Sequence, residues 1–438
     1  MRIAWFTPFA TRSAIGEFGR HVTAALAAHA DVDIWTADQA PLHQSDLRII
    51  HFNGAEDLDG ARADYDALVY NMGNYLAFHG EIHAVSQRHP GIVILHDRVL
   101  HHMFSVMWQS APESVDVTYV SRMATYYGAA GETVARESVT GVNQPVWERD
   151  DEVVKYPLDE EALQHALGAV THAQDHARYL RDRWFGPVRA LALPVYRDVL
   201  ATAAQKRFQD ERRADGRIQL TSIGHVIPNK NVGSVIEMLA ADAELATMVH
   251  YTIVGSLDAG SVYVEQLERL LRAAPELSVD ILGWRETDEL DQLMAATDVF
   301  VNLRQPVMES GSASLARELA FGRAVLCFDQ GYFSELPPDA VARVPSGDFD
   351  AAAAALRRLV LDADHRREIG ANALRLAGDL GEDHYAQALI EFIDEVQRAT
   401  PALMLLDRVA CELGKMRADP SLTVFDTIAS DFGRILTP

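Results

Sequence analysis

Short apolar runs alternate along the chain with longer segments in which apolar residues recur at helical spacing, as in 16–29. A run of about four to eight apolar residues is typical of a buried strand, and strands that alternate with helices indicate a parallel, doubly wound sheet. The pattern therefore predicts an α/β fold class. The expected strands are 2–6, 32–36, 48–52, 67–71, 91–97, 166–173 and 188–194, followed by 218–224, 250–255, 278–283, 298–303, 324–329 and 340–345.

The alternation occurs in two series, which are separated by a charged stretch. A chain of 438 residues is too long for a single hydrophobic core and suits two domains. We predict two Rossmann-like domains at 1–196 and 217–378, joined by a linker at 197–216 and followed by C-terminal helices at 379–438.

Composition narrows the class of protein and its compartment. The chain is 48% hydrophobic but has no apolar run near the length of about 18–20 residues that spans a membrane, and its N-terminus does not resemble a signal peptide. Its two cysteines, Cys327 and Cys411, argue against a disulfide framework and favour a cytoplasmic location. A net charge of −24 disfavours nucleic acid and leaves at most peripheral contact with a membrane. The pattern assigns no oligomeric state.

Candidate chemistry in the first half lies at the carboxyl ends of expected strands, where open parallel sheets bind ligands. His96 ends the strand 91–97 and can donate to a sugar hydroxyl or phosphate, or it can cap the following helix. Gly16, after the first strand, allows a ligand close to the backbone, or it is a plain turn glycine. No strand is followed by G-x-G-x-x-G, which argues against a nicotinamide enzyme. The acids Asp57 and Asp59 lie in a polar turn, and we expect no metal site.

The second half has its own candidates at strand ends. Lys230 is one of only four lysines and lies in the loop after 218–224, where its ammonium group can neutralise a diphosphate or can simply be solvated. Trp284 can lie against a nucleobase or pack between the domains. Arg304 can bind a phosphate or pair with an acid.

The segment 301–331 holds a carboxylate directly before a helix. Glu309 can accept hydrogen bonds from sugar hydroxyls, and Ser310, Gly311 and Ser312 open the helix, where unpaired N–H groups can bind a phosphate. The alternative is an ordinary strand–loop–helix crossover with a serine cap.

Taken together, these segments resemble the family-4 retaining glycosyltransferases, which use nucleotide sugars and have the GT-B fold. The loop SIGHVIPNKN is similar to their G-R-x-x-x-x-K-G diphosphate loop, and MESGSASLARELAFG is similar to their E-x7-E region. A bacterial subgroup shares the motifs at 71–79, 90–97 (P-G-x-V-x-L-H-D) and 302–306 (N-L-R-x-P). The resemblance covers nearly the whole chain. It implies two Rossmann-like domains that face a central cleft, with C-terminal helices that cross back to the first domain.

The resemblance also implies roles for individual residues. His96 would contact the donor sugar, Lys230 would bind its diphosphate, and Glu309 would hold its hydroxyls. The first domain would bind the acceptor, although the aromatic residues there could instead belong to the core. The implied donor-binding residues are Gly16, His225, Trp284, Arg304, Ser310, Gly311, Ser312 and Arg317, and the implied acceptor-binding residues are Tyr75, Phe78, His79 and Tyr126.

Two positions depart from the family pattern. His225 replaces the arginine of the diphosphate loop, and Arg317 replaces the second glutamate, which usually holds the nucleotide ribose. Glu318 is one place later and rotated by about 100° on the helix, so it cannot simply substitute. Arg317 would either act on the donor through its charge or form a structural ion pair.

The implied activity is retaining, metal-independent transfer of a sugar from a nucleotide-sugar donor to a hydroxyl of a glycan, lipid-linked glycan or natural product. The donor is a substrate, and no cofactor is expected. A catalytically silent GT-B protein that binds a nucleotide sugar or a protein partner is the alternative from another class, and a phosphorylase or epimerase on the same fold is a further one.

Overall fold

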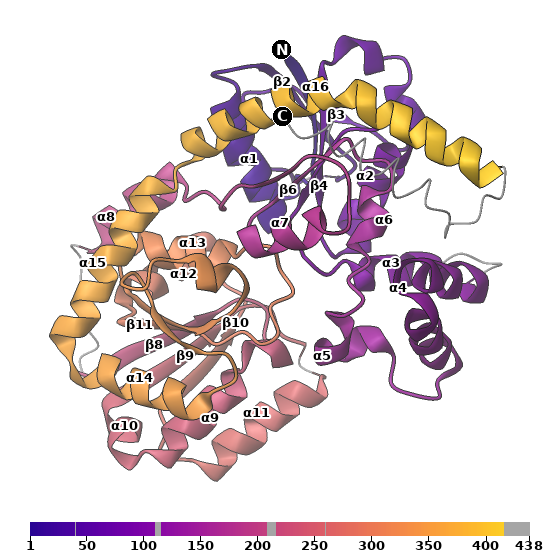
Figure 1. Cartoon of the computed structure of the whole chain (residues 1–438). Coiled ribbons are helices and arrows are strands. Elements are labelled where there is room, and N and C mark those ends of the chain that lie inside the picture. Colours follow the sequence, from indigo (N-terminus) through magenta and orange to yellow (C-terminus); the bar gives the residue numbers. More distant parts are fainter. Residues whose placement is uncertain (40, 110–114, 208–215, 259, 416–438) are drawn as a thin grey trace. The chain divides into compact units, whose positions relative to one another are not determined.

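The computed structural model describes residues 1–39, 41–109, 115–207, 216–258 and 260–415 (Figure 1). Within this range the chain forms two compact units. The first unit comprises 1–192, 308–311 and 383–415, and the second comprises 193–307 and 312–382. Residues 208–215 of the expected linker and 416–438 of the expected tail lie outside the described residues.

The first unit contains a seven-stranded sheet in the order β3-β2-β1-β4-β5-β6-β7, with every neighbouring pair parallel. The order reverses at β1 and β4, which is where parallel sheets bind ligands. The strands are β1 (Arg2–Phe6), β2 (Asp31–Thr36), β3 (Ile49–His51), β4 (Ala67–Met72), β5 (Ile92–Leu95), β6 (Gly168–Thr171) and β7 (Val188–Ala190).

Helices of the first unit include the last one in the described chain, α16. Its residues Phe392 and Val396 pack so closely on the backbone of β6 that a Cβ at Gly168 would lie 2.5 Å from Val396. Arg189 of β7 forms an ion pair with Glu395 of α16. The helices are α1 (Ala14–Leu26), α2 (Leu76–Arg88), α3 (His101–Gln109), α4 (Val115–Thr140), α5 (Asp150–Val153), α6 (Asp159–Leu163), α7 (Gln174–Arg181) and α16 (Glu382–Lys415), with short 3-10 turns η1 (Ala55–Leu58), η2 (Arg62–Asp64) and η3 (Val146–Glu148).

The second unit contains a six-stranded parallel sheet in the order β10-β9-β8-β11-β12-β13. Its order reverses at β8 and β11. The strands are β8 (Ile218–Ile223), β9 (Val249–Val254), β10 (Val279–Gly283), β11 (Val299–Asn302), β12 (Ala324–Asp329) and β13 (Ala342–Pro345). The helices are α8 (Arg197–Arg207), α9 (Val232–Ala241), α10 (Ala243–Met248), α11 (Val262–Ala273), α12 (Thr287–Ala296), α13 (Ala313–Ala320), α14 (Phe349–Leu361) and α15 (Ala363–Asp379), with 3-10 turns η4 (Pro228–Lys230) and η5 (Gly331–Glu335).

Each predicted strand is present, and both sheets are parallel with helices between their strands, so the predicted α/β class with two Rossmann-like units is confirmed. The pattern was readable because the inner strands are buried on both faces and therefore nearly continuous in apolar residues, whereas the edge strands β3, β7, β10 and β13 are only partly buried. Among the described residues, no helix combines the length and apolar character needed to cross a membrane.

Candidate functional site

In the first unit, the carboxyl ends of β4, β5 and β6 carry a buried polar network. His96 follows β5, and its Nε2 lies 3.0 Å from Oδ1 of Asn71 in β4. Its Nδ1 lies 3.2 Å from Nε2 of His172, which follows β6. Both ring nitrogens of His96 are therefore engaged inside the unit. A hydrogen bond from this ring to a donor sugar would have to replace the contact with Asn71 or the contact with His172.

The segment 308–311, which carries Glu309 and is called the glutamate loop below, belongs to this same unit. The N–H groups of Arg98 and Val99 donate to the carbonyl of Met308, at 2.8 and 3.0 Å. The N–H of Ser310 donates to the carbonyl of His96 at 2.9 Å, and its hydroxyl accepts from the N–H of His172 at 2.8 Å. The N–H of Ser310 thus has a protein partner, which conflicts with its expected role as a phosphate-binding amide.

The hydroxyl of Ser310 also lies 3.0 Å from Nδ1 of His176 in α7, and Nε2 of His176 lies 3.4 Å from Asp159 of α6. This order resembles a serine–histidine–aspartate triad. All three side chains are buried, however, and the hydroxyl is already occupied by His172. The arrangement therefore holds the glutamate loop in place and offers no accessible nucleophile.

Glu309 lies between these two anchored neighbours and forms an isolated antiparallel bridge with Asp97. Burial raises the pKa of Asp150 in α5, and the negative charges of Asp151 and Glu309 raise it further. Glu309 thus lies in an acidic part of the first unit, and its backbone is held on both sides.

The remaining first-unit candidates divide by exposure. Tyr75 is 56% exposed, and its ring meets that of the half-buried Phe78 edge-on at 5.3 Å. His79 is buried, and its Nδ1 donates to the backbone carbonyl of Asn71 at 3.0 Å, which shows a structural contact. Tyr126 donates to Glu161 at 2.8 Å and packs on the core.

Gly16 has a packing reason of its own. Its N–H donates to the N-cap hydroxyl of Ser13 at 3.0 Å, and a Cβ at this position would lie 3.0 Å from the carbonyl of Pro8 and 3.1 Å from that of Ala10. The close approach of the loop 8–10 to the start of α1 therefore accounts for a glycine here without a ligand.

In the second unit, Lys230 lies at the switch between β8 and β11. Gly224 follows β8 with a φ of +118°, and a Cβ there would lie 3.0 Å from Nζ of Lys230. Glycine at 224 thus permits the ammonium group to lie against the loop backbone. Gly224, Lys230, His225 and Asn302 line one small pocket at this edge of the sheet.

A buried chain of polar groups lies beside this pocket. Arg304, only 4% exposed, donates through Nε to Oδ1 of Asn302 at 3.1 Å and through a terminal nitrogen to Ser314 of α13 at 3.2 Å. The amide of Asn302 donates in turn to both carboxylate oxygens of Glu318, at 3.4 and 3.3 Å. Burial raises the pKa of Glu318 to about 7, against the lowering effects of Asn302, Arg304 and Lys230.

The two departures from the family pattern can now be located. Burial and the charge of Lys230 lower the pKa of His225, so its ring is neutral at pH 7 and does not replace an arginine. Arg317 lies 3.4 Å from the buried Asp291 of α12, and it lines a different small pocket with Pro194 and Tyr196. Arg317 thus forms an ion pair with an acid of its own unit, as the structural alternative for this residue expects.

The other second-unit candidates lie at the expected places. Ser312 is the N-cap of α13 and accepts from the N–H of Leu315 at 3.2 Å, directly after Gly311. Trp284, after β10, is 47% exposed. Glu318 is buried and accepts from the amide of Asn302.

Sequence reasoning missed five buried polar residues that connect the candidates. His172 could have been found by the rule that selected His96, because it also follows a strand, and His176 lies one helical turn beyond it. The amide side chains of Asn71 and Asn302 were overlooked because both residues lie inside apolar strand sequences. These residues are Asn71, Asp159, His172, His176 and Asn302.

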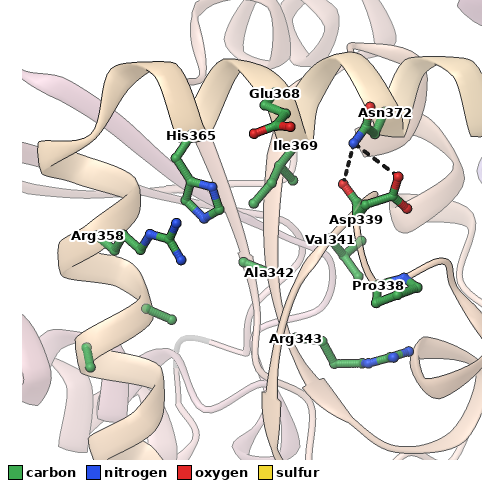
Figure 2. Close-up of a pocket in the computed structure, with 12 residues that line it drawn as sticks. Pro338, Asp339, Val341, Ala342, Arg343, Arg358, His365, Glu368, Ile369 and Asn372 are labelled. Atoms are coloured by element: carbon green, nitrogen blue, oxygen red, sulfur yellow. Dashed lines mark hydrogen bonds between the residues drawn. The ribbon is translucent and has the colours of Figure 1, made fainter.

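A larger pocket of about 520 Å³ lies elsewhere in the second unit (Figure 2). Arg358 of α14 and His365 and Glu368 of α15 surround it, and Asn372 donates to Asp339 on its far wall. It adjoins the start of β13, which is the amino end of the strand, and none of the predicted site residues line it. It is therefore separate from the site at the carboxyl ends. The described part of the chain holds no group of three or more His, Cys, Asp or Glu side chains arranged to bind a metal ion.

Comparison with known proteins adds an independent observation. Residues 204–375 match the model of the family Glycosyl transferases group 1. This group 1 segment includes Lys230, Arg304 and Glu309. No curated protein matches the sequence.

Solved glycosyltransferase structures share the fold. Anabaena HepE, solved in complex with UDP, is similar with a TM-score of 0.62 and 15% identity, covering 90% of this chain and 100% of that chain. Sucrose-phosphate synthase from Thermosynechococcus elongatus has a TM-score of 0.62 and 16% identity, covering 90% and 99%. WaaG, a glycosyltransferase involved in lipopolysaccharide biosynthesis, has a TM-score of 0.58 and 13% identity, covering 89% and 99%. At these identities the likeness shows the GT-B fold.

Proposed function

We propose that this protein is a retaining glycosyltransferase that moves a sugar from a nucleotide-sugar donor to a hydroxyl acceptor. The observation that carries the proposal is the cationic edge of the second sheet. Lys230 and Arg304 lie at its topological switch point, inside the segment that matches the glycosyl transferases of group 1. HepE was also solved with UDP-glucose, which makes UDP-sugars the first donors to test.

In this proposal Lys230 stabilises the diphosphate that leaves the donor sugar. A positioned ammonium group favours the transition state because negative charge builds on the leaving oxygens as the glycosidic bond breaks. His225 is neutral at pH 7 and adds no charge. The fixed guanidinium of Arg304 is buried beside the start of α13 and supplies the second positive charge at this edge.

Glu309 accepts hydrogen bonds from the donor sugar, and the acceptor binds at the exposed Tyr75 and the half-buried Phe78 beside it. A leaving phosphate oxygen takes the acceptor proton on the face of the sugar from which it departs, and this gives retention. The proposal assigns no metal and no cofactor to the reaction.

The proposal is tested first by binding. A ligand present at about 100 times its Kd stabilises the folded state by about 2.7 kcal/mol, so a thermal-shift panel of UDP, GDP and ADP and their sugars should identify one nucleotide. Transfer is then followed with that donor and a set of hydroxyl acceptors, and anomeric proton couplings in NMR report whether configuration is retained. Inversion would reject the retaining mechanism, and a panel without any stabilising nucleotide would reject the donor class.

A catalytically silent GT-B protein remains the second candidate, because both nitrogens of His96 and the N–H of Ser310 have protein partners. The two functions differ in one measurement. Donor turnover in the presence or absence of acceptors supports the enzyme, whereas tight nucleotide binding with neither hydrolysis nor transfer supports the silent protein.

A further inference from the structure

Two buried histidines of the first unit face each other across neighbouring strands. Nδ1 of His96 lies 3.2 Å from Nε2 of His172. The outer nitrogen of each ring faces an oxygen: Nε2 of His96 lies 3.0 Å from Oδ1 of Asn71, and Nδ1 of His172 lies 3.0 Å from the carbonyl of Leu191. The hydrogens on this pair can be counted from these partners.

A carbonyl oxygen only accepts, so Nδ1 of His172 must carry a hydrogen. The amide nitrogen of Asn71 donates to the carbonyl of Phe6 at 2.9 Å, which leaves Oδ1, also an acceptor, facing His96. Nε2 of His96 must therefore carry a hydrogen as well. A third hydrogen is needed between the two rings.

Two neutral imidazoles carry only two such hydrogens between them. A neutral pair must therefore set two lone pairs against each other, either between the rings or between His96 and Asn71. Only with one added proton does the pair form hydrogen bonds at all three contacts: with Asn71, between the two rings, and with the carbonyl of Leu191.

Other buried histidines of the same unit do not have this deficit. His101 donates from Nδ1 to the carbonyl of Tyr156 at 2.6 Å and can accept the hydroxyl of Tyr119 at Nε2, 2.7 Å away. His176 can donate from Nε2 to Asp159 and accept the hydroxyl of Ser310 at Nδ1. Both rings are fully satisfied while neutral, so the deficit belongs to the pair.

Opposing effects act on the pair. Burial lowers the pKa of His172 to about 4, the hydrogen bond to the carbonyl of Leu191 acts against this, and His176 lowers the pKa further. Burial holds the pKa of His96 well below 6.5, and His172 and His79 add to this effect. The ring of Phe18 packs against both histidines and the ring of Tyr385 packs against His172, and neither ring carries charge. Charged groups among the described residues around the pair include Asp97 and Arg98, which directly follow His96 in the sequence. Glu309 bridges Asp97, Asp159 contacts His176, and Asp175 of α7 pairs with Arg98.

We propose that His96 and His172 form one proton-binding pair, which takes up a single proton that the two rings share. The proton comes from solvent, forms one new N–H bond between the two rings and changes the charge of the pair from zero to plus one. The completed set of hydrogen bonds fixes the ring of His96, so His172 is a positioning residue for His96.

The proton count is measured on the full chain with nitrogen-15-labelled histidine. Imidazole NMR resolves which ring nitrogens carry hydrogen as the pH is lowered from 8. We expect His96 and His172 to titrate together as one transition of about one proton, while His101 stays in a single neutral tautomer. Independent titrations, or two rings that stay neutral until the protein unfolds, would overturn the pair. This experiment needs no variant and no ligand.

Discussion

The first four strands of each sheet follow the same order, β3-β2-β1-β4 in the first unit and β10-β9-β8-β11 in the second, but the side chains at their carboxyl ends differ in charge. The first unit gathers neutral histidines, because burial lowers the pKa of His96, His172 and His176. The second unit gathers the cations Lys230 and Arg304 beside the buried Glu318. The same backbone order can therefore carry an uncharged polar edge or a cationic one.

This difference suggests a division of labour within the proposed reaction. A cationic edge suits a diphosphate, whereas neutral imidazoles, amides and a carboxylate suit hydroxyl groups. We therefore assign the nucleotide to the second unit and the sugar hydroxyls and acceptor to the first. The two edges should therefore differ in stability and in activity as their charges require.

The largest expected effect is a loss of stability in acid that is concentrated in the first unit. The folded-state pKa is about 4 for His79, His83 and His101 and about 3 for His176, all below the ordinary value of 6.5. The unfolded chain therefore binds more protons as the pH falls through 6.5, and stability is lost progressively towards pH 4. Between pH 7 and 5.5 each of the four groups should cost about 1.2 kcal/mol, or about 5 kcal/mol together.

Hydrogen exchange measured at both pH values would show which unit loses protection. Equal loss in the two units, or greater loss in the second, would contradict the contrast between a histidine-rich edge and a cationic one.

Reversing the charge of Arg317 should destabilise the second unit by about 3 kcal/mol. Arg317→Glu removes the partner of the buried Asp291 and places a second acid beside it. The control is the exchange Arg317→Glu with Asp291→Arg, which restores an ion pair and should recover much of the loss in urea unfolding. Improved nucleotide binding in Arg317→Glu at unchanged stability would show that the pocket still follows the family pattern.

Lys230→Ala should reduce transfer by about 100-fold or more, equivalent to about 2.7 kcal/mol of transition-state stabilisation. The side chain lies in a polar loop, so the free energy of unfolding should change little. Lys155→Ala, which removes an exposed lysine paired with Glu152, is the matched control and should keep full activity. A Lys230→Ala enzyme with nearly natural turnover would remove the cationic edge from the mechanism.

Glu309→Ala should also reduce transfer by about 100-fold, but without weakening the binding of the free nucleoside diphosphate, because Glu309 is assigned to the sugar. The exposed Glu276→Ala serves as the control. Steady-state kinetics with the donor and thermal shifts with the nucleotide alone separate the two effects. A loss of nucleotide binding equal to the loss of activity would place Glu309 at the diphosphate instead.

The smallest expected effect is that of Glu318→Gln. Burial raises the pKa of Glu318 to about 7, so close to neutral pH the glutamine resembles the protonated acid in shape and charge. We expect a change in the free energy of unfolding of less than about 1 kcal/mol at pH 7. Glu318→Leu, which leaves the amide of Asn302 without an acceptor, should cost about 1–3 kcal/mol. Equal costs for the two variants would show that the contact with Asn302 contributes nothing.

The strand positions, both parallel sheets and the candidate residues at strand ends could be predicted from the sequence alone. Buried parallel strands are apolar over their whole length, and the polar residue that follows marks the edge where ligands bind. His96, Lys230 and Glu309 were all selected by that rule, although their roles in the reaction stay predictions.

Partners across long sequence separations could not be predicted. The N–H of Ser310 pairs with the carbonyl of His96, and Arg317 pairs with Asp291 on another helix, because the folded chain brings these groups together. A hydrophobic pattern records only which face of an element is buried, and it does not record which polar group meets which. The sequence by itself therefore determined the elements and the edges that carry chemistry. Only the tertiary structure decided the hydrogen-bond partners of each polar group, and with them the charge of each edge.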